Sequence, residues 1–126
     1  MSLPPSVLVG VGGALGAVAR QLVSVRLTRK REVVPRGTFA VNVAGSFALG
    51  LVTALGVGGD VALFVGTGAC GAFTTFSSFG VATVDRLERG QWLAAVANAL
   101  GTLVACLLAV ALGFAVAALL GSANLW

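Results

Sequence analysis

The sequence predicts an all-α integral membrane protein with four transmembrane helices, the third of them broken. Of its 126 residues, 58% are hydrophobic and only 10% are charged. The charged residues also avoid four long apolar segments. A transmembrane helix needs about 20 mostly apolar residues to cross about 30 Å of hydrocarbon. Because each segment meets or approaches that length, we expect residues 1–126 to form a single four-helix transmembrane domain.

The expected helices cover approximately residues 5–26, 37–56, 61–84 and 91–120. Pro5 suits the start of the first helix, since the missing N–H of proline costs nothing at that position. The residues before it lack the basic stretch of a signal peptide, and no clear cleavage motif follows, so we expect this helix to be a transmembrane span. The fourth segment is long enough that its helix should tilt or extend past the hydrocarbon.

Small residues recur at a spacing of four in the first and last helices. Gly12 and Gly16 form a GxxxG step, and Ala109 and Gly113 belong to a similar series. Such faces allow helix backbones to approach closely in a membrane. They predict close helix packing but do not indicate a cargo.

The third helix contains an unusual run of glycines and hydroxyl residues, Gly68–Phe79. Unwound backbone at membrane depth is tolerated only where it is buried in protein or lines a cavity. A break at Gly71–Thr75 would free carbonyl oxygens that can hold a hard monovalent cation. Phe73, Phe76 and Phe79 follow at a spacing of three. They are either lipid-facing or core rings, or rings whose electropositive edges contact an anion.

Neutral polar side chains repeat on one face of the second helix and one face of the fourth. They are Asn42 and Ser46, followed by Asn98, Thr102 and Cys106. Amide and hydroxyl donors suit a small anion that has to shed water. Hydrogen bonding between helices is the alternative, and we favour it for Ser46, Asn98 and Cys106.

The basic residues are distributed asymmetrically along the chain. All eight lie in or beside the first and third loops: Arg20, Arg26, Arg29, Lys30, Arg31, Arg36, Arg86 and Arg89. The positive-inside rule therefore predicts a multi-pass protein of the plasma membrane with both loops cytoplasmic and both termini outside.

Several function classes lack the residues that they require. No carboxylate or histidine lies inside a predicted span, which argues against a proton-coupled transporter. No nucleophile–base pair, metal-ligand cluster or phosphate loop supports an enzyme. An ion pathway is favoured. The alternatives are a small four-helix dimeric multidrug or cation exporter and a non-transporting scaffold.

Three blocks of the sequence carry a more specific signal. They are Gly12-Gly13-Ala14-Leu15-Gly16-Ala17-Val18-Ala19-Arg20, Gly37-Thr38-Phe39-Ala40-Val41-Asn42-Val43-Ala44-Gly45-Ser46-Phe47 and Gly71-Ala72-Phe73-Thr74-Thr75-Phe76-Ser77-Ser78-Phe79. In order and spacing they resemble the signature blocks of the Fluc (CrcB) fluoride channels, and the resemblance covers essentially the whole chain. It implies a fluoride-selective passive channel that exports cytoplasmic fluoride down its electrochemical gradient and so reduces fluoride toxicity.

The resemblance also implies an antiparallel dimer with two pores and a structural sodium ion (Na+) at the dimer interface. By position, Gly71 and Thr74 would offer backbone carbonyls to the sodium. Arg20 would attract anions at the inner vestibule or anchor the end of the first helix, and we favour the anchor.

The same resemblance assigns a fluoride pathway by position. Asn42 would donate its amide to fluoride, and Phe76 and Phe79 would be the rings that line the pore. Thr75 and Ser78 would add hydroxyl contacts.

Two features depart from the pattern that the resemblance implies. Many members carry a tyrosine and then serines on the fourth helix, whereas this chain has no tyrosine, and Thr102 stands in for a serine hydroxyl. The eight-to-zero distribution of Lys and Arg favours one fixed orientation. We therefore expect pairing with an oppositely oriented homologue, with a homodimer as the alternative.

Overall fold

The computed structural model describes residues 3–28 and 35–123, and within these ranges the secondary structure is entirely helical. Four helical stretches are long and apolar enough to cross a membrane: Pro5–Leu27, Arg36–Ala54, Gly59–Glu88 and Trp92–Gly121. The predicted all-helical fold with four spans is confirmed. The basic residues at 29, 30 and 31 lie outside the described residues.

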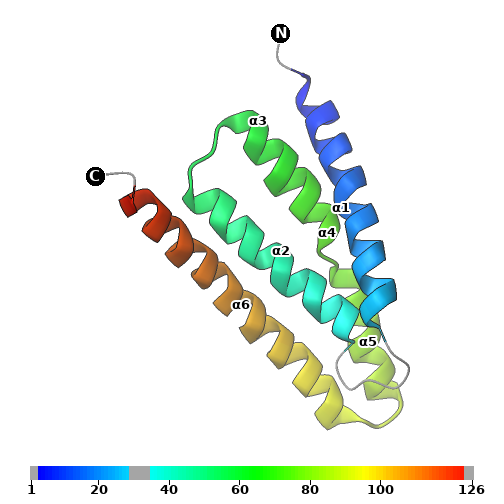
Figure 1. Ribbon diagram of the computed structural model, residues 1–126. Helices are drawn as coiled ribbons and strands as arrows, with labels where there is room; N and C mark the ends of the chain where they lie inside the picture. The colour runs from blue at the N-terminus through cyan, green and yellow to red at the C-terminus, as the bar shows by residue number, and fades with distance from the viewer. Residues whose placement is uncertain (1–2, 29–34, 124–126) are drawn as a thin grey trace.

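The four spans are arranged side by side (Figure 1). The first span is α1 (Pro5–Leu27), the second is α2 (Arg36–Ala54) and the last is α6 (Trp92–Ala123). The third span lies between α1 and α2, and α6 packs along α2. This order places the third span, with its break, in contact with both of the first two helices.

The third span consists of several helical pieces: α3 (Gly59–Val61), the π-helix η1 (Ala62–Cys70), α4 (Gly71–Phe73) and α5 (Phe76–Glu88). Backbone torsions turn extended at Thr74 (φ −78°, ψ 158°) and Thr75 (φ −146°, ψ 112°). The helix therefore continues past Gly71 and is interrupted only at these two threonines. This is consistent with the predicted broken third helix, but the interruption occupies only the last part of the expected Gly71–Thr75 stretch.

Glycines of α1 bring two backbones together. A Cβ at Gly12 would collide with the Phe64 carbonyl, and one at Gly16 would collide with the Ala69 carbonyl. The GxxxG step therefore packs against η1 of the same chain. Because no side chain fits between them, this close approach fixes the position of the third span against α1.

A second glycine contact joins α2 and α6. A Cβ at Gly50 would lie 2.5 Å from the Val110 carbonyl, and one at Gly113 would lie 2.5 Å from the Phe47 carbonyl. Both small-residue faces found in the sequence are thus used for packing within the chain. The outward faces of the helices carry large apolar side chains, such as Leu107 and Leu108 on α6.

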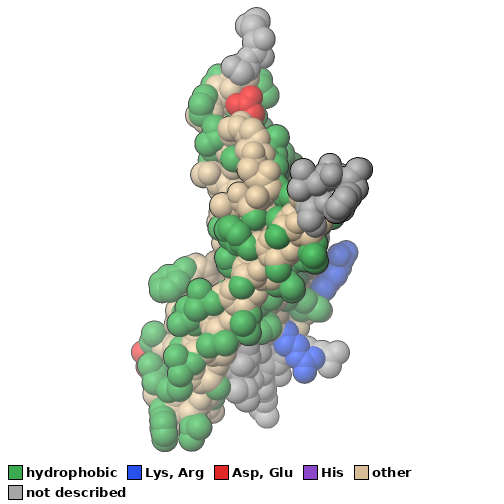
Figure 2. Space-filling model, turned by 90° about the vertical axis from the view of Figure 1, so that its left-hand side faces the viewer, with side chains coloured by type: hydrophobic (Ala, Val, Ile, Leu, Met, Phe, Trp, Pro, Cys, Tyr) green, Lys and Arg blue, Asp and Glu red, His purple; other side chains and the backbone are tan. Residues whose placement is uncertain are grey.

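The basic residues described by the structure gather towards one end of the molecule. The last turn of α1 contains Arg26, α2 begins at Arg36, and α5 and its C-cap contain Arg86 and Arg89. These helix ends lie together, and the α2–α3 connection lies at the opposite end (Figure 1). Figure 2 shows a largely hydrophobic face whose visible basic side chains lie well away from the acidic side chain near its top. We call the end that contains Arg26, Arg36, Arg86 and Arg89 the basic end.

Candidate functional site

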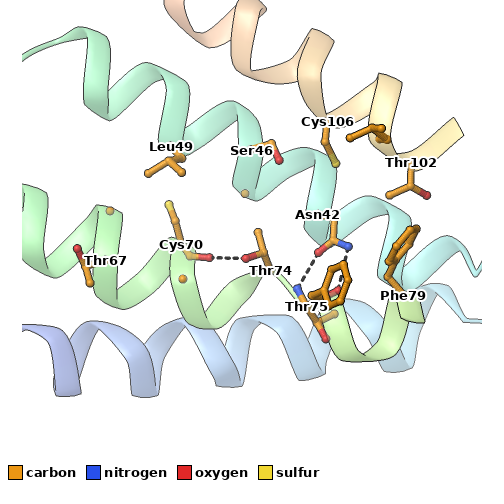
Figure 3. Close-up of a pocket in the computed structure, with 15 residues that line it drawn as sticks. Asn42, Ser46, Leu49, Thr67, Cys70, Thr74, Thr75, Phe79, Thr102 and Cys106 are labelled. Carbon is orange, nitrogen blue, oxygen red and sulfur yellow. Dashed lines mark hydrogen bonds between the residues drawn. The ribbon is translucent and has the colours of Figure 1, made fainter. Parts of the chain in front are cut away.

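The interruption of the third span is closed by a side chain from α2. The Thr75 N–H donates to Asn42 Oδ1 at 2.7 Å, and Asn42 Nδ2 donates to the Thr75 carbonyl at 3.1 Å (Figure 3). An amide has one acceptor and two N–H donors, so it can satisfy both backbone groups of one extended residue. Asn42 thus replaces the helical hydrogen bonds that Thr75 cannot make.

The hydrogen bonds between Asn42 and Thr75 change the backbone hydrogen bonding on both sides of the break. In a continuous α-helix the Thr75 N–H would donate to the Gly71 carbonyl, but here it donates to Asn42. Likewise the Ser78 N–H donates to Thr75 Oγ1 at 3.2 Å instead of the Thr74 carbonyl. Both the Gly71 and the Thr74 carbonyls therefore lose the partners that a helix would give them.

Thr75 is also the N-cap of α5 and the centre of a hydroxyl cluster. Its Oγ1 donates to Ser78 Oγ at 3.1 Å and lies 3.2 Å from Ser77 Oγ. Ser and Thr oxygens at this position satisfy N–H groups that the first turn of a helix leaves open. The N-terminal end of a 13-residue helix is thereby directed at the break, and such an end favours negative charge.

A cavity of about 590 Å³ opens beside the break. We call it the central cavity. Seven residues assigned to ion sites in the sequence line it: Asn42, Gly71, Thr74, Thr75, Phe76, Phe79 and Thr102. The residues that the sequence singled out in α2, the third span and α6 therefore lie at one place in the fold (Figure 3).

The two phenylalanines form a pair on the first turn of α5. Their ring centroids are 5.7 Å apart and their planes are inclined at 45°. The Phe76 side chain is 83% exposed, which is unusual for a ring that lines a cavity. Tilted ring pairs present edges as well as faces, and the edges are electropositive.

The polar residues of α6 divide into two groups. Asn98 is buried and its Nδ2 donates to Thr83 Oγ1 on α5 at 2.9 Å, so the predicted interhelical role of Asn98 is confirmed. Thr102 and Cys106 line the central cavity, as does Ser46 of α2. Within the described residues Ser46 and Cys106 make no interhelical hydrogen bond, and the interhelical role that we favoured for both stays a prediction.

The remaining two candidates lie elsewhere. Ser78 lines a separate groove of about 490 Å³ between the start of α2 and α5. Arg20 is half-buried on α1 and is not among the residues that line the central cavity. Sequence reasoning missed Cys70 and Thr67, which also line this cavity. Their place just before the glycine-rich break was the available signal.

Comparison with known proteins gives a consistent result. The family described as CrcB-like protein, Camphor Resistance (CrcB), matches residues 7–114. The fluoride-specific ion channel FluC 2 of Haloarcula marismortui is 49% identical over 116 residues, covering 92% of this chain and 96% of the relative. FluC 2 of Natronomonas pharaonis is 50% identical over 120 residues, covering 95% and 100%. FluC of Methylobacterium radiotolerans is 44% identical over 125 residues, covering 94% and 87%.

Proposed function

The chain belongs to the CrcB-like protein family, and we propose that it is a fluoride-specific channel through which cytoplasmic fluoride leaves the cell passively. The observation that carries this proposal is the break at Thr75, which lies beside a cavity lined by neutral hydrogen-bond donors. A helix interruption at this depth is tolerated where it lines a cavity. The names of the relatives supply the ion.

Asn42 contributes to the pathway through its second amide proton. One N–H of Nδ2 is used by the Thr75 carbonyl, and the other is left to replace a water molecule around a passing fluoride. The hydroxyl of Thr102 lines the same cavity from α6. The rings of Phe76 and Phe79 tolerate the anion at their edges. Neutral donors bind fluoride weakly enough to release it, which conduction requires.

A sodium ion fits the freed carbonyls at the break. The Gly71 and Thr74 oxygens lack their helical N–H partners, and both residues line the central cavity. Backbone carbonyls suit a hard monovalent cation. Hard cations such as Ca²⁺ and Mg²⁺ take about six or more oxygen ligands, so two carbonyls from one chain are too few. The ion would hold two broken helices together, one from each of two chains.

A dimer follows from the same reasoning. The exposed ring of Phe76 and the incomplete cation site both become covered when a second broken helix is placed against the first. Antiparallel pairing makes two pores that run in opposite senses. Because the Lys and Arg residues favour one orientation, we propose an oppositely oriented homologue as the partner, with self-pairing as the alternative.

The orientation in the plasma membrane follows from the basic end. The positive-inside rule places this end, with the first and third loops, in the cytoplasm. Arg20 then anchors α1 near the inner surface. An inside-negative potential drives an anion outward by about 2.3 kcal/mol per charge per 100 mV. No coupling to ATP or protons is needed for export, which lowers the toxicity of fluoride.

The exporter alternative is weaker for a physical reason. Proton-coupled export uses an ionisable group inside the membrane. The carboxylates that the structure describes, Asp60, Asp85 and Glu88, lie near the ends of the third span. Its break contains only neutral residues, which suits an anion better than an organic cation.

The test is fluoride efflux from liposomes that contain only the purified chain, read with a fluoride electrode. Chloride-loaded liposomes are the control. Fast release of fluoride without chloride supports both the channel and self-pairing. If no fluoride is released, the measurement is repeated with a co-expressed homologue. Absence of efflux from that pair as well would refute the proposed function.

A further inference from the structure

A groove continues the central cavity towards the end of the molecule that lies opposite the basic end. Its volume is about 520 Å³, and it lies between the last turns of α2 and the first half of the third span. It shares Leu49, Gly66 and Thr67 with the central cavity and reaches Gly56 in the α2–α3 connection. We call it the turn-end groove. Because the two spaces share these residues, they lead from the break to one end of the protein.

One face of α2 lines both the cavity and the groove. Asn42, Ser46 and Leu49 line the central cavity, and Leu49 and Thr53 line the turn-end groove. These four residues are spaced by four, three and four positions, which keeps them on one face of an α-helix. Figure 3 shows this face running from Asn42 to Leu49, away from Phe79. The polar side chains of α2 thus form a row that leads out of the cavity.

The π-helix η1 forms the opposite wall. Ala62, Gly66 and Thr67 line the groove, and Gly66, Thr67 and Cys70 line the cavity. A π-helix forms i→i+5 hydrogen bonds, so residues about four to five positions apart share a face. This conformation is rare and is frequent at functional sites. In η1 it gives the cavity and the groove one continuous wall.

The hydroxyls of Thr53 and Thr67 lack the hydrogen bonds that other threonines of the spans make. Thr74 and Thr83 each donate to a carbonyl four residues earlier, at 3.1 Å and 2.8 Å. Among the residues that the structure describes, the Thr53 and Thr67 side chains have no hydrogen-bond partner. A hydroxyl without a partner is costly away from water. Both hydroxyls can therefore donate to an ion that has lost part of its hydration shell.

The place where the groove meets the cavity is kept open by a missing side chain. A Cβ at Gly66 would lie 3.7 Å from Leu49 Cδ1, which is an ordinary van der Waals distance. Packing therefore does not require glycine at this position, in contrast to Gly12 and Gly16. Every residue that lines the groove is neutral, so an anion that enters it can be bound weakly enough to leave.

We propose that the turn-end groove is the part of the fluoride pathway that joins the central cavity to the outer surface, with the Thr67 hydroxyl as the donor that replaces water around the ion. The ion passes between Leu49 and Gly66 and reaches the surface at the α2–α3 connection. This inference rests on the proposed function and adds to it the route by which fluoride leaves the cavity.

The test measures initial fluoride efflux in the liposomes in which the wild-type chain shows efflux. Thr67→Val removes the hydroxyl at nearly constant size, and Thr67→Ser keeps it. Gly66→Val fills the space beside Leu49. Gly10→Val is the matched control, because Gly10 lines neither the groove nor the cavity and a Cβ there would meet nothing within 4 Å.

We expect Thr67→Val to lower efflux about tenfold, because the ion loses one hydrogen-bond donor. The temperature of thermal unfolding in detergent should not fall, since the hydroxyl has no partner within the described part of the chain. Gly66→Val should lower efflux at least as strongly. Thr67→Ser and Gly10→Val should stay within about twofold of the wild type.

Three results would overturn the inference. One is efflux of Thr67→Val within about twofold of the wild type, and another is an equal loss in Thr67→Val and Thr67→Ser. The last is efflux of Gly66→Val equal to that of Gly10→Val. If Gly66→Val does not fold, the two Thr67 variants decide the matter. Absence of efflux from the wild-type chain and from its co-expressed pair would instead refute the proposed function.

Discussion

Asn42→Asp tests the helix break with almost no change in side-chain shape. The wild-type amide accepts from the Thr75 N–H at 2.7 Å and donates to the Thr75 carbonyl at 3.1 Å. Aspartate keeps the acceptor but sets a second oxygen against that carbonyl. The carbonyl is left without its donor, which costs about 1–3 kcal/mol of folding free energy.

The carboxylate also acts directly on the permeating ion. A unit negative charge about 5 Å from fluoride, at an effective dielectric of about 20, raises the energy of the ion by about 3 kcal/mol. That increase in barrier lowers the rate by a factor of about 10². We therefore expect fluoride efflux from liposomes to fall by about two orders of magnitude at neutral pH.

Asn98→Asp is the matched control, because Asn98 is also a buried amide with a hydrogen bond to another helix. Its partner is the Thr83 hydroxyl, which can turn away from the Phe79 carbonyl and donate to a carboxylate, whereas a backbone carbonyl cannot donate at all. Since Asn98 does not line the central cavity, we expect its variant to lose less than about tenfold in efflux. Efflux of Asn42→Asp within about threefold of the wild type would refute the role given to Asn42.

Three further predictions test the packing, the cap and the cation. Gly12→Val should lower the free energy of unfolding by about 3 kcal/mol, because its side chain would collide with the Phe64 carbonyl. Thermal unfolding in detergent measures this, and Gly10→Ala, whose Cβ would meet nothing within 4 Å, should unfold like the wild type. Thr75→Val removes the N-cap, so it should lower the free energy of unfolding by about 0.5–2 kcal/mol and reduce fluoride efflux. Thr75→Ser should keep both at wild-type values, and equal efflux in the two variants would contradict this prediction. Replacing Na+ with a bulky organic cation should weaken the dimer in sedimentation experiments, and an unchanged dimer would exclude the sodium proposal.

The spans and the break were predictable because they depend on local sequence. Hydropathy over about 20 residues identifies a transmembrane helix without knowledge of its neighbours. Glycines and hydroxyl residues at membrane depth likewise mark a break before any contact is known. The spacing of Phe76 and Phe79 was enough to place both rings on one face of α5, where they contact each other.

The position of the break within the third span could not be predicted, because it depends on a residue 33 positions away. Asn42 captures Thr75, and the interruption therefore occurs there and not at Gly71. The place of Ser46 and Cys106 at the central cavity could not be predicted for a similar reason. Periodicity gives the face of a helix that a residue occupies, but only packing decides whether that face meets a helix or a cavity.

The groove between the start of α2 and α5 could not be recognised from the sequence either. The sequence places Arg86 in a loop, in agreement with the positive-inside rule, and nothing in the neighbouring residues indicates that its side chain is buried. Its position follows from the packing of α5 beside the start of α2. The charge pattern therefore indicates the end of the molecule at which Arg86 lies, and only the structure shows that its side chain is buried beside this groove.

The long-range hydrogen bonds between Asn42 and Thr75 have a consequence for biogenesis. During synthesis α2 emerges well before the third span, and the two threonine backbone groups can be satisfied by Asn42 only after the spans have docked. Until then, the third span meets its own hydrogen-bonding needs best as a continuous helix, since unpaired backbone groups are costly in lipid. A newly inserted chain in that state has no ion site. We therefore expect the break, and the cavity beside it, to form only after α2 and the third span have docked.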